Sequence, residues 1–521
     1  SEAIYILTLT GCLMLSLIGK HAFSMLAHPE WHDQYFWFSS MIAKVLQNFT
    51  IAPETASTMT TVLRWVHHFL VLGFLMYIPS SKHLHVLAAG PNTFLRTLDI
   101  NKGMHKTNLE DPNATTFGAG KITELSWKST LDMYACTECG RCQDACPAWN
   151  TEKPLSPKKL IVDTKHELME NSSKVLAKGA KPEDAPKLIN AHVTDDVIWA
   201  CTSCRACESE CPVFIEHTDI IFEARRNLVL MESRFPPELQ TVFKNVETNF
   251  SPWAMSPEDR DKWADGLDIK RMSDVASSGT SVEYLFWVGC AGSFDDRNTK
   301  VSKALVNILR KADVKFAILG KEEKCTGDPV RRMGNEYLAQ TLIQENVNTL
   351  NNYGVKKVVT ACPHCFNAIK NEWKDFGGNY EVIHHTQLIA ELIASGKIKP
   401  SKQIDQQITY HDSCYIGRWN NEYSAPRAIL NSIPGIKFTE MDKNSKKGMC
   451  CGAGGGRMWM EEHIGRRVNV VRTEQALEKN PQAIVANCPF CITMLTDGIK
   501  TKEKVDSVKI TDLAELVDQS L

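Results

Sequence analysis

Two copies of one cysteine spacing constrain this chain more than any other feature of its sequence. Each copy reads C-x2-C-x2-C-x3-C-P, and the two comprise Cys136, Cys139, Cys142 and Cys146, then Cys201, Cys204, Cys207 and Cys211. In this spacing three thiolates hold one [4Fe–4S] cube, and the fourth cysteine ligates the other cluster. We therefore expect crossed sets, namely Cys136, Cys139, Cys142 and Cys211 for one cluster, and Cys201, Cys204, Cys207 and Cys146 for the other. Zinc knuckles are the alternative, although tetrahedral zinc does not require a doubled spacing that ends in proline.

The number of cysteines also indicates where such a protein works. The chain has 18 cysteines among 521 residues, and a chain of this length buries its own core without disulfide bonds. We therefore expect metal ligands or redox centres in a reducing compartment. Lys and Arg total 59 against 61 Asp and Glu, so the chain lacks the basic excess typical of nucleic-acid binding, and we expect no nucleic-acid partner.

The carboxyl-terminal part of the chain reads as a duplication over residues 283–395 and 407–520. Each copy has three short apolar runs, YLFWVGC, KFAILG and KKVVTACPHC in the first, and QITYHDSC, IKFTEM and QAIVANCPFC in the second. The segments between these runs have helical periodicity, and strands that alternate with helices predict a parallel α/β sheet. The cysteines then fall near the carboxyl ends of strands, where such sheets bind ligands.

Each repeat supplies its own cysteines. The two sets are Cys290, Cys325, Cys362 and Cys365, then Cys414, Cys450, Cys451, Cys488 and Cys491. The second set, C-x35-C-C-x36-C-x2-C, resembles the cysteine-rich (CCG) repeat of the heterodisulfide reductase family, and the resemblance implies a non-cubane [4Fe–4S] cluster on these five residues. The first set has Thr326 in place of the fifth cysteine, and we expect a cubane cluster there. Zinc in either repeat, or an empty first site, is the alternative.

A glycine run, GAGGG at residues 452–456, follows Cys450 and Cys451. No clean strand precedes it, and no acidic residue follows at the distance of a dinucleotide-binding fingerprint. We interpret the run as backbone that closes around the cluster. Two histidines are near cysteines in the sequence: we expect His364 to be a hydrogen-bond donor, and the role of His411 stays open.

Two apolar runs, residues 2–19 and 58–79, precede the cysteine motifs. Both have about the length that spans a bilayer. Aromatic residues between them suit a membrane interface, namely Trp31, Tyr35 and Trp37. A signal peptide is the alternative for the first run, which lacks a basic start and a small-residue cleavage site. Because the chain begins with Ser1, we expect a fragment or a processed product with further helices upstream.

Histidines in and after the second run suggest haem. On one continuous helix His67 and His85, 18 residues apart, would share a face about 27 Å apart along the axis, although Pro79 can kink such a helix. The runs WVHHFL and IPSSKHLH resemble the last helix of the nitrate-reductase gamma-subunit cytochrome. The resemblance implies that His67 and His85 ligate b-type haem, one or two in number, with His21 a weak substitute for the missing partner ligands. Interfacial histidines are the alternative.

The predicted architecture is multidomain. Transmembrane helices come first, then an α-helical two-[4Fe–4S] ferredoxin domain, similar to that of fumarate reductases and heterodisulfide reductases, then the duplicated α/β cysteine-rich domain. We expect a cytochrome b-like segment over 1–100, a two-cluster domain over 101–235, a helical linker over 236–282, and repeats over 283–400 and 401–521. Basic residues after the second run predict that the cluster domains lie on the cytoplasmic side of the inner membrane. These residues are Lys82, Arg96, Lys102 and Lys106.

The segments TFGAGKITELSW, CTECGRC and CTGDPVRRMGNEYLAQ resemble those of the membrane-bound iron–sulfur electron-transfer-flavoprotein:menaquinone oxidoreductases. The resemblance implies an oxidoreductase that takes electrons from reduced electron-transfer flavoprotein and passes them through four [4Fe–4S] clusters and b haem to menaquinone. Two alternatives stay open. One is a heterodisulfide or other thiol–disulfide reductase, and the other is an electron-relay subunit of a lactate or glycerol-3-phosphate dehydrogenase.

Overall fold

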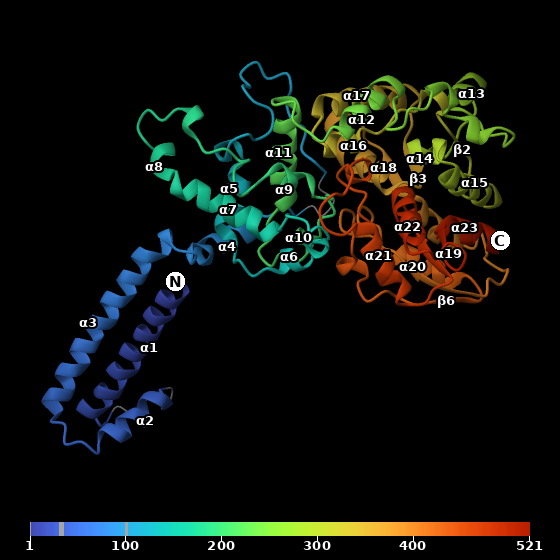
Figure 1. Cartoon of the computed structure of the whole chain (residues 1–521). Helices are drawn as coiled ribbons and strands as arrows, with labels where there is room; N and C mark the ends of the chain where they lie inside the picture. The colour runs from blue at the N-terminus through green and yellow to red at the C-terminus, as the bar shows by residue number, and fades with distance from the viewer. Residues whose placement is uncertain (1, 31–35, 99–102) are drawn as a thin grey trace. The chain divides into compact units, whose positions relative to one another are not determined.

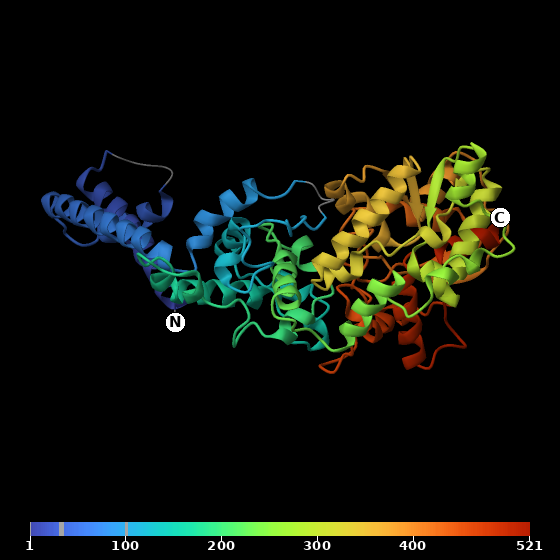
Figure 2. The same ribbon diagram turned by 90° about the horizontal axis from the view of Figure 1, so that it is seen from above.

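The computed structural model describes residues 2–30, 36–98 and 103–521 (Figures 1 and 2). The chain divides into two compact units, residues 1–91 and 92–521. Four residues named above lie outside the described residues, namely Ser1, Trp31, Tyr35 and Lys102.

The first unit is helical. Its helices are α1 (Glu2–Ala27), α2 (Trp37–Leu46), α3 (Pro53–Tyr77), the 3₁₀ turn η1 (Ile78–Ser80) and the start of α4 (Leu84–Phe94). α1 packs along α3. Within the described residues two segments are long and apolar enough to cross a membrane, Ile4–Ala27 and Pro53–Ser80. Cys12 in α1 is exposed.

The expected continuous helix through His67 and His85 is also wrong. α3 ends at Tyr77, and the 3₁₀ turn Ile78–Ser80 separates it from α4. Pro79 accounts for the break, because proline has no backbone N–H and its ring clashes with the carbonyl four residues earlier. The spacing of about 27 Å along one shared axis therefore does not apply.

The second unit begins with a helical domain around the doubled cysteine motif. Its helices are α5 (Trp127–Ala135), α6 (Arg141–Asp144), α7 (Pro157–Glu170), α8 (Ser172–Val175), α9 (Asp195–Trp199), α10 (Ala206–Ser209) and α11 (His217–Leu230). Ser126 and Ser156 cap α5 and α7, since their side chains accept hydrogen bonds from backbone N–H groups of the first turn. A linking segment follows with α12 (Glu238–Asn249) and α13 (Met272–Ser278).

The predicted α/β repeats are present, each with a parallel four-stranded sheet. The first contains β1 (Tyr284–Trp287), α14 (Gly289–Phe294), α15 (Asp296–Lys311), β2 (Phe316–Ala317), α16 (Asp328–Arg332), α17 (Glu336–Asn352), β3 (Lys357–Thr360), α18 (Pro363–Asn367), β4 (Glu381–His384) and α19 (His385–Ala394). The second contains β5 (Gln406–Tyr410), α20 (Ser424–Ser432), β6 (Ile436–Phe438), α21 (Val468–Leu477), β7 (Ala483–Ala486), α22 (Pro489–Thr501), β8 (Lys509–Asp512) and α23 (Leu513–Ser520).

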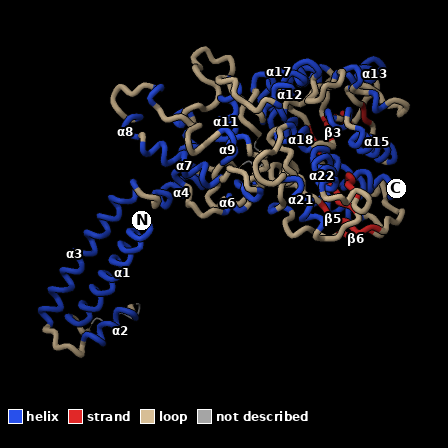
Figure 3. The backbone as a smooth tube through the Cα atoms, viewed as in Figure 1, coloured by secondary structure: helices blue, strands red, loops and turns tan. Residues whose placement is uncertain are grey.

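The two sheets have equivalent strand orders, β2-β1-β3-β4 and β6-β5-β7-β8. Figure 3 shows the strands, in red, gathered in this part of the chain. The first cysteine of each repeat follows the central strand β1 or β5, and the C-x2-C pair follows the other central strand, β3 or β7. The cysteines of each repeat are thereby brought to the carboxyl edge of its sheet, as predicted for a parallel α/β sheet.

The repeats pack on each other through α15 and α23, which lie side by side in both views (Figures 1 and 2). Arg297 on α15 makes a bidentate ion pair with Glu515 on α23, at 3.0 and 2.6 Å. A shared hydrophobic core contains buried residues of both repeats, including Phe286, Leu305 and Ile484. The duplication therefore folds as one body rather than as two independent sheets.

Candidate iron–sulfur sites

The first group of cysteines in the dicluster domain comes from two separate loops. Its members line one small pocket, and they are Cys136, Cys139, Cys142 and Cys211. Cys136 ends α5, and Gly140 before α6 adopts a φ of +85°, which glycine reaches without steric cost and which reverses the loop between Cys139 and Cys142. Burial raises the pKa of Cys136 to about 11 and that of Cys142 to about 12.

The second group lines a neighbouring pocket with the crossed membership that the spacing predicts. Its members are Cys146, Cys201, Cys204 and Cys207. Burial raises the pKa of Cys201 to about 11, and it raises the pKa of Cys146 further. Buried thiols this close together resist ionisation unless a cation compensates their charge. The donor set therefore fits a metal cluster, and ligation itself stays a prediction.

The first repeat gathers its four cysteines around a pocket that also includes Trp287 and Thr326. The cysteines are Cys290, Cys325, Cys362 and Cys365. Thr326, at the position of the missing fifth cysteine, directs its hydroxyl at the Cys365 sulfur over 3.9 Å. The site thus has a weak hydroxyl donor in the place where the second repeat has a thiol.

A buried arginine from the linking segment completes this site. The Arg260 guanidinium donates to the Cys290 sulfur at 3.3 Å and to Glu323 at 3.1 Å. Glu323 in turn accepts hydrogen bonds from the backbone N–H groups of Val288 and Gly289 at 2.9 Å. A hydrogen bond from Cys325, together with Arg260, lowers the pKa of Cys290 to about 6. The chain therefore stabilises a thiolate at Cys290.

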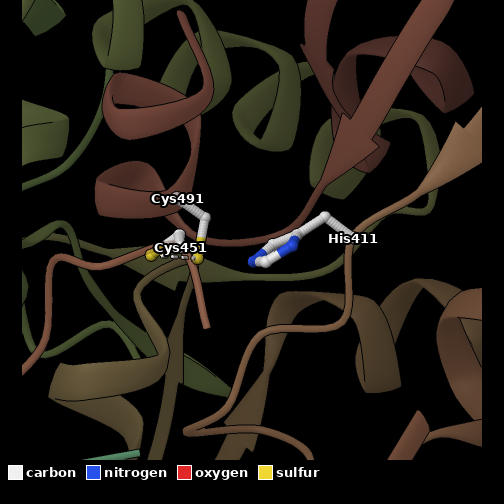
Figure 4. Close-up of side chains that lie close together, drawn as sticks. All are labelled: His411, Cys451 and Cys491. Atoms are coloured by element: carbon white, nitrogen blue, oxygen red, sulfur yellow. Dashed lines mark hydrogen bonds between the residues drawn. The ribbon is translucent and has the colours of Figure 1, made fainter. Parts of the chain in front are cut away.

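The five cysteines of the second repeat are all buried, namely Cys414, Cys450, Cys451, Cys488 and Cys491. The Sγ atoms of Cys451 and Cys491 are 3.4 Å apart. His411 also faces this site, and Figure 4 shows its ring directed at those two sulfur atoms. Burial and the neighbouring Arg472 lower the pKa of His411 to about 3, so the imidazole is neutral.

The dicluster domain touches the second repeat directly at its cysteines. The Cys204 thiol donates a hydrogen bond to Cys450. Arg418 fastens the two loops, because its guanidinium donates to the backbone carbonyls of Cys204 and Gly448, both at 2.6 Å. Two groups of cysteines that lie far apart in the sequence are therefore in contact.

One buried tyrosine joins three of the four groups. Tyr415, next to Cys414, stacks on His364, which lies between Cys362 and Cys365, with ring centroids 3.9 Å apart. Its hydroxyl is 2.9 Å from the hydroxyl of Ser203 in the dicluster loop. The hydroxyl also accepts a hydrogen bond from Arg332 Nε at 3.0 Å. Asp328 pairs with His364 at 2.9 Å and holds the pKa of that histidine above its usual value despite burial.

The glycine run is where the second repeat meets the dicluster loop. A Cβ atom on Gly455 would lie 2.5 Å from the carbonyl oxygen of Cys201. Arg225 on α11 donates to that same carbonyl and to the carbonyl of Gly455, both at 2.8 Å. These contacts fit the interpretation that the glycines allow a close approach of the backbone. The loop that they approach belongs to the dicluster domain and not to the second repeat.

Sequence reasoning missed the residues that connect the groups. These are Arg225, Arg260, Glu323, Tyr415, Arg418 and Arg472. Each of them makes a hydrogen bond to a residue at least 30 positions away in the sequence. A short sequence motif therefore cannot identify these residues.

The two proposed haem histidines lie in different settings. His67 Nδ1 on α3 is 3.0 Å from the hydroxyl of Ser16 and 3.2 Å from the carbonyl of Leu13, both on α1. His85 at the start of α4 is 2.6 Å from the carbonyl of Lys82. The structure does not bring the two histidines together on one helix face, and their role as haem ligands stays a prediction.

Comparison with known proteins agrees with this architecture. Residues 132–215 match the 4Fe-4S dicluster domain family, and residues 284–370 and 408–496 each match the cysteine-rich domain family. The probable iron-sulfur-binding oxidoreductase FadF of Bacillus subtilis is 39% identical over an alignment of 550 residues, which covers 99% of this chain and 77% of FadF. The EtfAB:quinone oxidoreductase of Syntrophomonas wolfei is 43% identical over 483 residues, 88% of this chain and 67% of that protein.

A third relative comes from Methanosarcina barkeri. It is one polypeptide of the dihydromethanophenazine:CoB–CoM heterodisulfide reductase, and it is 34% identical over 401 residues, 75% of this chain and 94% of that polypeptide. A dicluster domain in contact with two cysteine-lined α/β repeats defines an iron–sulfur oxidoreductase. The chain belongs to the iron–sulfur oxidoreductase family that includes FadF, the EtfAB:quinone oxidoreductase and this heterodisulfide reductase polypeptide.

Proposed function

We propose that this oxidoreductase transfers electrons from reduced electron-transfer flavoprotein to menaquinone. The observation that carries the proposal is the contact between Cys204 of the dicluster domain and Cys450 of the second repeat. It places two candidate cluster sites side by side within one compact unit. The relative named EtfAB:quinone oxidoreductase supports both the flavoprotein donor and the quinone acceptor.

Four ligand sets are part of the proposal. They are Cys136, Cys139, Cys142 and Cys211; Cys146, Cys201, Cys204 and Cys207; Cys290, Cys325, Cys362 and Cys365; and Cys414, Cys450, Cys451, Cys488 and Cys491. The first three sets suit cubane [4Fe–4S] clusters, and the five-cysteine set suits a non-cubane cluster. When bound, such clusters accept and donate one electron at a time.

Two arginines place positive charge beside the cysteines of these sites. Arg260 donates a hydrogen bond to the Cys290 sulfur, and the thiols of Cys204, Cys414 and Cys450 surround Arg418 closely enough to raise its pKa. The Arg260 guanidinium is buried and that of Arg418 is partly buried, so water screens their charge only weakly. They offset the charge that thiolate ligands bring into the interior.

The first unit is proposed to deliver electrons into the membrane. α1 and α3 have the length and composition of membrane-spanning helices, which supports an anchor in the cytoplasmic membrane with the cluster domains on the cytoplasmic side. We also propose b haem at His67 and His85, on the resemblance to the gamma-subunit cytochrome. Each haem would take its second axial ligand from another helix.

Anaerobic stopped-flow mixing tests the proposed reaction. The purified protein in menaquinone-containing proteoliposomes is mixed with electron-transfer flavoprotein reduced in advance by dithionite and freed of excess reductant. We expect the iron–sulfur absorbance to bleach rapidly and menaquinol to accumulate. A reduced flavodoxin of similar potential is the control donor. Equal rates with both flavoproteins, or no menaquinol, would contradict the proposal.

A second candidate, thiol–disulfide reduction, is favoured by the 34% identity to the heterodisulfide reductase polypeptide. The same preparation, reduced and offered the mixed disulfide of coenzymes B and M, distinguishes the two. Reoxidation by the disulfide faster than by menaquinone would support the reductase. Reduction by lactate or glycerol 3-phosphate dehydrogenase alone would instead indicate an electron-relay role.

A further inference from the structure

The two repeats place an aromatic N–H group at the same structural position beside their cysteines. Trp287 ends β1, and His411 directly follows β5; each lies three residues before the first cysteine of its repeat. Trp287 pairs with Thr360 in the first sheet, and the His411 backbone N–H continues the second sheet with a 2.8 Å hydrogen bond to Val485. The two side chains therefore leave equivalent edges of equivalent sheets.

The hydrogen bond from Arg472 decides which nitrogen of His411 carries the proton. Arg472 Nε lies 3.0 Å from His411 Nδ1. A guanidinium has only donors, so Nδ1 must accept, and the ring must be neutral with its proton on Nε2. Arg472 is itself fixed by hydrogen bonds to the carbonyl of Lys443 at 3.0 Å and to the side chain of Gln475 at 2.9 Å.

The protonated Nε2 is directed into the cluster site. Nε2 of His411 is buried and has no hydrogen-bond partner among the described residues. The same is true of Nε1 of Trp287. One ring nitrogen of His411 and the sulfur atoms of Cys451 and Cys491 lie within 4.8 Å of one another, and Figure 4 shows the ring facing the two sulfur atoms. A buried N–H without a partner is destabilising, so this geometry favours an acceptor beside Nε2.

The spacing of His411, Cys451 and Cys491 also resembles a small metal site with one nitrogen and two sulfur ligands. The tautomer excludes that role, because a nitrogen that carries a proton has no lone pair for a metal. Resting on the function proposed above, we propose that His411 donates its Nε2–H hydrogen bond to a ligand sulfur of the five-cysteine site, and that Trp287 does the same in the first repeat. His411 is then a donor to the cofactor and not a ligand.

The hydrogen bond has a consequence that can be measured. A donor to a ligand sulfur stabilises the more negative, reduced form of an iron–sulfur cluster and raises its reduction potential. Because histidine and tryptophan occupy equivalent positions, each is expected to act on the cluster of its own repeat. The equivalent positions of His411 and Trp287 provide an internal control, because replacing either residue should change the potential of one cluster only.

The test compares His411→Gln with His411→Leu in the full-length protein. Glutamine can accept from Arg472 through Oε1 and donate through Nε2, whereas leucine can do neither. We expect both variants to keep the wild-type iron and sulfide content. His411→Leu should give one cluster a more negative midpoint potential in an EPR-monitored titration, and His411→Gln should restore most of that shift. Trp287→Phe should lower the potential of a different cluster.

Each other outcome overturns part of the scheme. Loss of iron or zinc in both His411 variants would make the histidine a ligand, and an unchanged potential in His411→Leu would remove the hydrogen bond. If the leucine variant does not fold, ¹⁵N-histidine-labelled wild-type protein decides: weak ¹⁵N coupling to a reduced cluster supports a donor, and strong coupling, or none, overturns it. Wild-type protein without iron in the second repeat would instead overturn the proposed function together with the inference.

Discussion

At the scale of single residues, Thr326 is the position where the two repeats differ in chemistry. It is 2% exposed, its hydroxyl points at the Cys365 sulfur, and its counterpart in the second repeat is Cys451. We predict that Thr326→Cys gives the first repeat a five-cysteine site, because the new thiol takes the place of a hydroxyl of similar size. The EPR or Mössbauer signature of the five-cysteine cluster should roughly double in intensity.

Thr326→Ser is the matched control for this change, since it keeps the hydroxyl and adds no sulfur. Its spectra should equal those of the wild type. A Thr326→Cys protein whose spectra are also unchanged would show that the fifth thiol does not determine the type of cluster.

The residue scale also separates what the sequence could predict from what it could not. Cysteine spacing predicted the grouping seen in the pockets, because each set depends on short loops whose separation can be read directly. The roles of Arg260 and Tyr415 could not be predicted in this way. Arg260 reaches Cys290 from another segment, and Tyr415 meets Ser203 across 212 residues. Such contacts depend on how the domains pack against each other, and the spacing of cysteines in the sequence carries no information about that packing.

Among the elements, the loop of glycines between Cys451 and α21 leaves little room for side chains. Gly455 has a φ of +63°, and a Cβ there would lie 2.5 Å from the Cys201 carbonyl oxygen. We predict that Gly455→Ala destabilises the second unit by about 2–5 kcal/mol, the sum of about 1–2 kcal/mol for a left-handed alanine and about 1–3 kcal/mol for local overpacking. Urea unfolding followed by circular dichroism measures the loss.

Gly279 provides the control for this element. Its φ is +65°, and no atom lies within 4 Å of a Cβ built there. Gly279→Ala therefore carries the backbone strain without the clash, and should cost only about 1–2 kcal/mol. Equal losses in the two variants would mean that the glycine loop has room to move away from the dicluster domain.

Element boundaries were predicted unevenly. The three apolar runs of each repeat became strands, whereas β4 (EVIH) and β8 (KITD) were missed, because short edge strands with polar ends carry no apolar run. The helix expected through His85 is interrupted at Pro79. The two serines that follow donate side-chain hydrogen bonds to preceding backbone carbonyls, Ser80 to that of Tyr77 and Ser81 to that of Ile78, both at 3.1 Å. Local hydrogen bonds there replace the helical ones.

At the scale of the whole molecule, the four cysteine sets predict a metal content. Four [4Fe–4S] clusters require about sixteen non-haem iron atoms and about sixteen acid-labile sulfides per chain. We expect anaerobically purified protein to approach both values, measured by colorimetric assay against amino-acid analysis. About eight of each would mean that the repeats hold no cluster, and zinc in place of iron would contradict the assignment altogether.

Arg225 on α11 connects all three cluster-bearing parts of the second unit. Its guanidinium donates to the carbonyls of Ile198 and Cys201 in the dicluster domain, of Arg332 in the first repeat and of Gly455 in the second, at 2.8–3.0 Å. The side chain is fully buried, so each carbonyl that loses this donor is left unsatisfied at about 1–3 kcal/mol. No local pattern in the sequence marks this arginine.

We therefore predict that Arg225→Met uncouples the dicluster domain from the repeats and does more than lower stability uniformly. Urea unfolding should separate into two transitions, and limited proteolysis should cut the segment between α11 and β1 under conditions that leave the wild type intact. Arg234→Met is the control from the same segment: Arg234 is about half exposed, pairs with Asp195 and Glu232 at the surface, and should change stability by no more than about 0.5 kcal/mol. Arg225→Met could instead unfold in a single transition whose urea midpoint is shifted no further than that of the control. That result would show that the hydrophobic contacts alone join the domains.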